Sequence, residues 1–114
     1  MVGAALRPGD IVWVVFDPAY GHEQAGRRPA LVLSLESYNA ISSVILICPI
    51  TRSQSGWPFL VAVDAGSGIE GSVIVDQIRA VDRRRIVAAA NARLSDACMN
   101  EVRGKLAALT GMVF

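Results

Sequence analysis

The chain has 114 residues, of which 53% are hydrophobic and 18% are charged, with eleven Lys and Arg against ten Asp and Glu. This length suits one domain spanning residues 1–114, and the high hydrophobic content excludes intrinsic disorder. A net charge of +1 also excludes a strongly basic coat for nucleic acid, so any contact with RNA or DNA must come from a local cluster.

Short apolar segments separated by turns dominate the first three quarters of the chain. Residues 11–16 are β-branched or aromatic and apolar at every position, which predicts a strand covered on both faces. Trp13, which alternates with Ile11 and Val15, is predicted to belong to the core rather than to serve as a stacking platform. Further strands are predicted at residues 29–34, 43–50, 58–63, 72–75 and 77–81. Strands of this length and spacing predict a mainly β fold, as a small barrel or sandwich.

The last fifth of the chain has the pattern of a helix. Ser95 is a candidate N-cap and Gly111 is a candidate helix stop. Apolar side chains recur at helical spacing through this segment, at Cys98, Val102, Leu106, Leu109 and Val113. Such an apolar stripe needs a surface to cover, which is either the β part of the same chain or a second subunit.

The cysteines and apolar runs bear on the cellular compartment. Cys48 and Cys98 are the only two cysteines, and with a single histidine they exclude a disulfide framework and a structural zinc site. Both are predicted to be small buried apolar residues in a reducing compartment. The N-terminal residues do not form a secretion signal, and the longest apolar runs are too short to cross a membrane. The sequence predicts a cytoplasmic protein.

Two polar loops interrupt the strands and carry the candidate chemistry. The first, residues 21–29, reads Gly-His-Glu-Gln-Ala-Gly-Arg-Arg-Pro and lies between two strongly hydrophobic strands. The second, residues 51–55, reads Thr-Arg-Ser-Gln-Ser and follows the third predicted strand. Loops held on a rigid sheet are where binding and catalytic groups concentrate. Barrel topology would join the two loops in one groove lined by Arg28, Glu23 and Thr51, which suits an anion such as a phosphodiester.

Several motifs occur in an order and spacing that resemble the MazF/PemK family of mRNA-interferase toxins. They are Gly-Asp-Ile-Val-Trp-Val-Val-Phe-Asp-Pro at 9–18, the loop and strand at 21–34, Tyr38-Asn39, Cys48-Pro-Ile-Thr51, Gly56-Trp-Pro-Phe59 and Asp76-Gln77-Ile-Arg. Several separate motifs in register make the match specific where any one alone would be weak. The resemblance implies an SH3-like β-barrel with a C-terminal helix, of the CcdB/PemK type, that forms a homodimer.

The resemblance also implies an activity, the sequence-selective cleavage of single-stranded RNA without a metal or another cofactor. In that chemistry the ribose 2′-OH attacks the adjacent phosphorus and leaves a 2′,3′-cyclic phosphate and a free 5′-OH. The step needs a base for the hydroxyl, an acid for the leaving oxygen, and donors that stabilise charge on the phosphoryl oxygens. The resemblance further implies a cognate antitoxin that neutralises the toxin by laying a disordered segment over the RNA groove.

Three residues match the catalytic positions of the family. Arg28 matches the catalytic arginine, whose guanidinium would stabilise and orient the scissile phosphate; the alternative is a structural pair with a carboxylate such as Glu23. Thr51 matches the active-site threonine, a hydroxyl donor to the phosphate; the alternative is an ordinary β-branched strand end. Glu23 matches a glutamate that acts either as the general base or as the residue that orients Arg28, and the sequence leaves this choice open.

Seven further residues are candidates for binding RNA: His22, Gln24, Arg27, Ser53, Gln54, Trp57 and Gln77. Gln24, Ser53 and Gln54 either hydrogen-bond to the base edges of an unstacked strand or face solvent as ordinary loop residues. Arg27 is interpreted as an auxiliary phosphate contact. His22, the single histidine, could act as a base at neutral pH but is interpreted as a loop donor or a solvated side chain. Trp57 either stacks on a base or packs over the end of the barrel. Asp76 and Gln77 either line the groove or satisfy buried backbone groups.

Arg83, Arg84 and Arg85 form the one conspicuous basic run. It either grips phosphates along the RNA or forms a solvated turn. Two other functions are alternatives to the nuclease: a non-enzymatic, gyrase-poisoning toxin like CcdB, and a non-catalytic SH3-like binding module. The first polar loop and Thr51 favour the nuclease, because neither alternative needs a groove for phosphoryl transfer.

Overall fold

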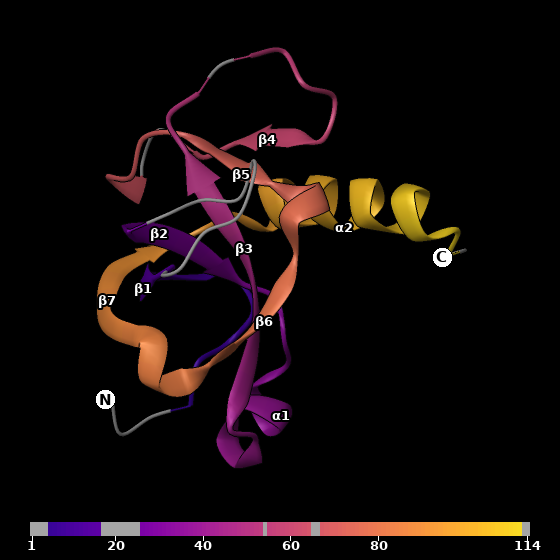
Figure 1. Cartoon of the computed structure of the whole chain (residues 1–114). Helices are drawn as coiled ribbons and strands as arrows, with labels where there is room; N and C mark the ends of the chain where they lie inside the picture. Colours follow the sequence, from indigo (N-terminus) through magenta and orange to yellow (C-terminus); the bar gives the residue numbers. More distant parts are fainter. Residues whose placement is uncertain (1–4, 17–25, 54, 65–66, 113–114) are drawn as a thin grey trace.

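The computed structural model describes residues 5–16, 26–53, 55–64 and 67–112 (Figure 1). Its strands are β1 Asp10–Val15, β2 Arg27–Val32, β3 Val44–Thr51, β4 Leu60–Ala62, β5 Ser72–Ile74, β6 Arg79–Asp82 and β7 Ile86–Arg93. The helices are α1 Glu36–Ile41 and α2 Asp96–Thr110, and two single 3-10 turns, η2 Val75–Gln77 and η3 Arg83–Arg85, flank β6. The prediction of a mainly β fold with a C-terminal helix is confirmed.

Strand β3 is the centre of the sheet. It pairs with β2 along one edge; along the other edge it pairs with β6 near its beginning and with β5 near its end. All pairings are antiparallel, and the strand order is β4-β5-β3-β2-β1-β7. Figure 1 shows β3 running from α1 at one end of the molecule to β4 and β5 at the other. The last residue of β3, Thr51, is therefore fixed beside β5, where it faces Ser72.

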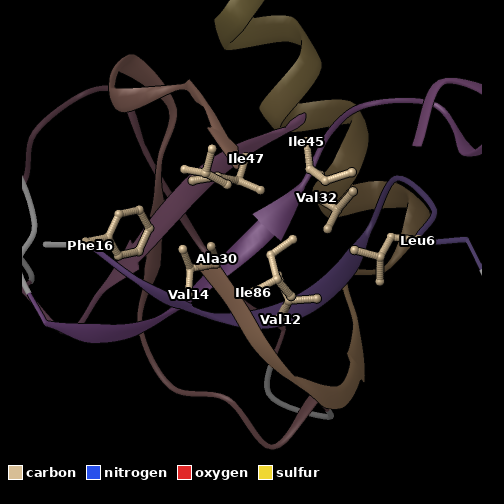
Figure 2. Packing of buried hydrophobic residues seen from close by; sticks show 10 residues of the cluster. Leu6, Val12, Val14, Phe16, Ala30, Val32, Ile45, Ile47 and Ile86 are labelled. Carbon is tan, nitrogen blue, oxygen red and sulfur yellow. The ribbon is translucent and has the colours of Figure 1, made fainter. Parts of the chain in front are cut away.

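Two hydrophobic clusters lie on opposite faces of the sheet. Figure 2 shows the first, which contains Leu6, Val12, Val14, Phe16, Ala30, Val32, Ile45, Ile47, Val81 and Ile86. The second contains Ile11, Leu31, Cys48, Ile50, Val61, Val73, Val75, Leu94, Met99 and Val102. Because neighbouring residues of a strand point to opposite faces, Ile11 enters one cluster and Val12 the other. This confirms that β1 is covered on both faces at Ile11, Val12 and Val14, whereas Trp13 and Val15 are only half-buried.

Helix α2 covers the second cluster. Its Ser95 N-cap accepts a hydrogen bond from the backbone of Cys98, and Gly111 ends the helix with a left-handed φ of 75°. Met99 and Val102 are buried against the sheet, whereas Leu109 at the far end of the predicted stripe is exposed. The surface that the helix covers is thus the sheet of its own chain.

The predicted barrel is matched only loosely, because the sheet is not closed. Its path ends at β4 and β7, and these two strands do not pair in the part of the chain that the structure describes. The apolar surface near β4 is covered instead by α2, which packs on β4 and η2. A helix that buries this surface removes the driving force for a further strand pairing.

Three expectations about local structure need correction. Strand β7 was not predicted, because four of its eight residues are alanines, which are depleted in strands. Residues 75–77, at the junction of two predicted strands, form the turn η2. Cys48 is buried as predicted, but Cys98 is only half-buried; both are free thiols. Burial raises the pKa of the Cys48 thiol to about 12, with a smaller contribution from the Asp76 carboxylate.

The Tyr38-Asn39 motif has a structural role. Asn39 on α1 is completely buried, and its amide nitrogen donates to the carbonyls of Leu6 and Ser34, each at 2.8 Å. The Ser34 hydroxyl donates to the Asn39 side-chain oxygen. A buried amide with its hydrogen bonds made fixes the segments that it joins, here the N-terminal segment and the connection between β2 and β3.

Within the described residues, no helix has the length and apolar character needed to span a membrane.

Candidate active site

In place of the single predicted groove, the structure has two hollows that share the C-terminal end of β3. Ile50 and Arg52 line one hollow, and Thr51 and Ser53 line the other. This division follows from the alternation of side chains along an extended chain. We call the first the arginine hollow and the second the threonine hollow.

The arginine hollow has a volume of about 430 Å³. Its lining consists of Trp13, Arg27, Arg28, Pro29, Ile50, Arg52, Gly68, Ile69 and Glu70. The three guanidinium groups outnumber the single carboxylate, so the hollow attracts anions. The Arg27 guanidinium carbon lies 5.5 Å from the centre of the Trp13 ring, a cation–π contact.

The threonine hollow has a volume of about 610 Å³. It brings together four of the predicted site residues, Thr51, Ser53, Trp57 and Gln77. The Thr51 hydroxyl oxygen accepts a hydrogen bond from the backbone N–H of Ser53 at 3.1 Å. A hydroxyl that accepts in this way can still donate its own hydrogen, which is what contact with a phosphate oxygen requires.

Trp57 is held in place at the edge of the threonine hollow. Its indole Nε1 donates to Asp76 Oδ2 at 3.0 Å, and its ring packs tilted against Phe59 with 5.8 Å between ring centres. The side chain nevertheless stays 49% exposed. Trp57 thus packs on its neighbour and also presents ring surface to the hollow, and its stacking on a base stays a prediction. Asp76 lines the hollow and fixes the direction of the indole N–H.

Arg28 and Thr51 come from the adjacent ends of neighbouring strands. The β2–β3 ladder pairs Ala30 with Pro49 and Leu31 with Cys48. This register, continued by two residues, aligns Arg28 with Thr51. The two candidates nevertheless line different hollows, Arg28 with Arg27 in the arginine hollow and Thr51 with Ser53 in the threonine hollow.

Four of the predicted site residues, His22, Glu23, Gln24 and Gln54, lie outside the described residues. The first three belong to the connection between β1 and β2, so Arg27 and Arg28 directly follow that connection in the chain. Their proposed roles stay predictions, and so does the choice between a general base and an orienting residue for Glu23.

Gly71 lies very close to the backbone of Thr51. It has a φ of 136°, and a Cβ built on it would lie 2.5 Å from the Thr51 carbonyl oxygen and 3.1 Å from an Ile50 side-chain carbon. Real Cβ atoms do not approach a backbone oxygen so closely, so only glycine fits this backbone here. Gly71 therefore allows β5 to reach the end of β3.

The basic run forms the turn η3, at the opposite end of β3 from Thr51. Asp82, beside η3, pairs with Val44 at the start of β3, and the seven residue steps from Val44 to Thr51 span roughly 23 Å. The three side chains bind within the chain: Arg83 donates to the Ser42 carbonyl, Arg84 to the Asp82 carboxylate, and Arg85 to the Val15 carbonyl. This placement favours the solvated turn over contact with RNA.

We expect Arg84→Ala to change the titration of Asp82 and to leave RNA binding unchanged. The hydrogen bonds from Arg84 lower the pKa of Asp82 from 3.8 to about 2. The stabilisation from this pair is therefore present above about pH 4 and is lost as the pH falls through about 2. Carboxyl NMR titration should show the Asp82 pKa rising towards its ordinary value in the variant. A shallower salt dependence of RNA binding in the variant would instead show that Arg84 contacts RNA phosphates.

Trp13 and Arg52 line the arginine hollow, but the sequence did not single them out as site residues. The alternation of Trp13 with Ile11 and Val15 along β1 favoured a core position for Trp13, which is wrong. The residue pairs with Pro29 across the β1–β2 ladder and lies half-buried. Arg52 follows Thr51 directly, and this adjacency is the signal that could have identified it.

Among the residues placed by the structure, no three His, Cys, Asp or Glu side chains gather as metal ligands would.

The family model for PemK-like, MazF-like toxins of type II toxin-antitoxin systems matches residues 7–110. The chain belongs to this family. The endoribonuclease toxin MazF of Escherichia coli K12 is 35% identical over 103 residues, which cover 90% of this chain and 92% of that protein. The endoribonuclease PemK of Escherichia coli is 33% identical over 109 residues, which cover 91% of this chain and 81% of PemK.

Solved structures place this PemK/MazF-family chain among the same proteins. A crystal structure of MazF from Deinococcus radiodurans is similar with a TM-score of 0.87 and 42% identity, covering 95% of this chain and 98% of that one. A MazE-MazF crystal structure from the same organism is similar with a TM-score of 0.84 and 39% identity, covering 96% of this chain and 99% of the matched chain. The fold and the family are thus supported by sequence and structure together.

Proposed function

We propose that this protein is an endoribonuclease toxin that cleaves single-stranded RNA at selected sequences. Membership of the PemK/MazF family across residues 7–110 carries the proposal. The relatives named above are endoribonucleases, and they cover nearly the whole chain. The described residues of the two hollows include groups that RNA cleavage needs. These are guanidinium groups that can bind phosphate oxygens and, in the neighbouring hollow, a hydroxyl that can donate a hydrogen bond.

The proposed reaction is an attack by the ribose 2′-OH on the adjacent phosphorus. A bond forms between the 2′ oxygen and phosphorus, the bond from phosphorus to the 5′ oxygen breaks, and the products are a 2′,3′-cyclic phosphate and a free 5′-OH. The 2′ proton passes to a base, and an acid returns a proton to the 5′ oxygen. Charge on the phosphoryl oxygens is stabilised by the Arg28 guanidinium and the Thr51 hydroxyl.

Glu23 either takes the 2′ proton or orients Arg28 in this scheme. Four further residues line the same two hollows as Arg28 and Thr51 and therefore contact the RNA around the cleaved bond: Arg27, Ser53, Trp57 and Gln77. His22, Gln24 and Gln54 complete the predicted RNA contacts. The reaction as proposed uses no metal ion, since the side chains themselves handle the protons and the charge.

The proposal extends to partners. A MazE-MazF structure from Deinococcus radiodurans is similar to this chain, so we assign this toxin a cognate antitoxin whose disordered segment covers the RNA groove. We also assign it a homodimeric state in the cytoplasm.

Cleavage of a long, defined RNA in the presence of EDTA tests the proposed activity. We expect discrete fragments with 5′-OH ends, which polynucleotide kinase labels without prior dephosphorylation, and 3′ ends that resist phosphatase until the cyclic phosphate is opened by acid. A single 2′-deoxyribose at the mapped cleavage nucleotide should block the cut. Intact RNA together with inhibition of gyrase supercoiling would identify a gyrase poison instead. Cleavage that EDTA abolishes would overturn the metal-independent step.

A further inference from the structure

Trp13 occupies an unusual place for an aromatic residue of a central strand. β1 is paired on both edges, and its neighbours Val12 and Val14 are completely buried. Trp13 instead lies half-buried in the lining of the arginine hollow, where the Arg27 guanidinium lies over its ring at 5.5 Å. The indole and the guanidinium that lies over it form a flat surface on which a further ring can stack.

The rest of the hollow supplies the charge and the volume for one nucleotide. Arg28 and Arg52 add two exposed guanidinium groups to that of Arg27, against one carboxylate from Glu70. Its volume of about 430 Å³ lies within the range of small-molecule sites, about 300–1,000 Å³. Ile50 and Ile69 add apolar walls. Unstacked bases of single-stranded RNA bind on aromatic rings and on arginine planes, while their phosphates bind to arginine.

We propose that the arginine hollow binds one nucleotide of the RNA next to the cleaved bond, with its base stacked on the surface that Trp13 and Arg27 form together. This inference rests on the proposed nuclease function and specifies a subsite of it. The phosphate of that nucleotide lies against Arg28 and Arg52. The two hollows share the end of β3. The RNA strand that leaves the arginine hollow therefore passes Thr51 and continues along the threonine hollow towards Trp57.

The two hollows thus predict two stacking surfaces on either side of the cleaved bond, Trp13 on one side and Trp57 on the other. Stacking on a ring tolerates any base, so selectivity at the Trp13 subsite comes from the polar groups that surround it. The Glu70 carboxylate lines this hollow and can accept a hydrogen bond, so it favours a base that presents an amino group.

Abasic substitution in the RNA tests the subsite directly. The substrate is a short RNA that contains the mapped cleavage sequence, with a single abasic nucleotide placed in turn at each position around the cleaved bond. For the wild-type protein we expect one position next to the bond at which the missing base raises KM by about tenfold or more. In Trp13→Leu the intact RNA should already show this rise, and the abasic nucleotide at that position should add nothing.

Two variants separate stacking from folding. Trp13→Phe keeps an aromatic ring and should keep the penalty at the same abasic position. Tyr38→Leu removes an exposed aromatic ring on α1, outside both hollows, and should leave the whole abasic profile unchanged. Thermal unfolding of each variant is measured alongside. A merely structural role for Trp13 would lower activity for all substrates equally, and this outcome would overturn the proposal.

Fluorescence gives a readout that does not depend on cleavage. The chain has two tryptophans, so Trp57→Phe leaves Trp13 as the single indole. Addition of an uncleavable RNA, with 2′-deoxyribose at the cut position, should quench this fluorescence. Unchanged fluorescence on RNA binding overturns the subsite, and quenching by the antitoxin alone assigns the hollow to the protein partner. Cleavage by the wild-type protein is scored independently, so the subsite can fail while the nuclease function stands.

Discussion

Arg28→Ala should reduce the rate of RNA cleavage by about 100-fold or more and leave the fold intact. Loss of one preorganised group that stabilises transition-state charge costs about 10²–10³ in rate. Arg28 is exposed at the start of β2, and no member of either hydrophobic cluster is altered by its truncation. Single-turnover cleavage with saturating enzyme measures the chemical step, and thermal unfolding checks the fold.

Two further variants define the role of the Arg28 guanidinium. Arg28→Lys keeps the charge but loses the planar fork, so we expect a rate between those of wild type and Arg28→Ala. Arg103→Ala removes an exposed arginine of α2 that lines neither hollow, and it should cleave like wild type. Full activity in Arg28→Ala would remove this residue from the catalytic site.

Gly71→Ala should destabilise the protein by about 3 kcal/mol or more. Two costs add, since a side chain at a φ of 136° is strained and its Cβ would lie 2.5 Å from the Thr51 carbonyl oxygen. Backbone strain and overpacking each cost about 1–3 kcal/mol. The end of β3 must shift to relieve the contact, so the hydroxyl of Thr51 moves and cleavage falls as well. Urea unfolding measures the free energy, and the cleavage rate is measured without denaturant.

Gly111→Ala is the matched control for strain alone. Gly111 also has a positive φ, 75°, but a Cβ built on it would have nothing within 4 Å. We expect a loss of only about 1 kcal/mol for this variant and no change in the cleavage rate. Equal losses in the two variants would show that the contact with Thr51 is not what requires glycine at position 71.

The sequence predicted the strands that are strongly apolar and the helix that is capped. β1, β2 and β3 carry β-branched and aliphatic side chains that bury on two faces, and such segments need no knowledge of their neighbours. β7 escaped prediction because its alanines have little strand preference of their own. Its pairing with β1 decides its conformation, with two register irregularities and a positive φ at Asn91, and pairing is not readable from local pattern.

The site was predicted where residues match family motifs, and less well where the tertiary structure assembles it. Thr51, Ser53, Trp57 and Gln77 line one hollow, and their roles towards RNA stay predictions. Trp13 was placed in the core because alternation along β1 says which face a side chain takes but not how far that face is covered. Side-chain alternation along β3 separates Thr51 from Ile50 and Arg52, but Arg28 lies opposite Thr51 on the neighbouring strand, so its place in the other hollow is visible only in the tertiary structure.

Strand β3 also has a consequence for the dynamics of the molecule. It has paired neighbours on both edges, and Ile45, Ile47 and Ile50 are almost fully buried, so its amide protons should exchange with solvent only through global opening. Thr51 therefore sits at the border between the slowest-exchanging backbone and the segment 52–57 that follows it. Exposed side chains that directly follow Thr51, such as those of Arg52 and Ser53, can be replaced at little cost in stability, so the surface at the end of β3 can change in evolution while Thr51 keeps its place.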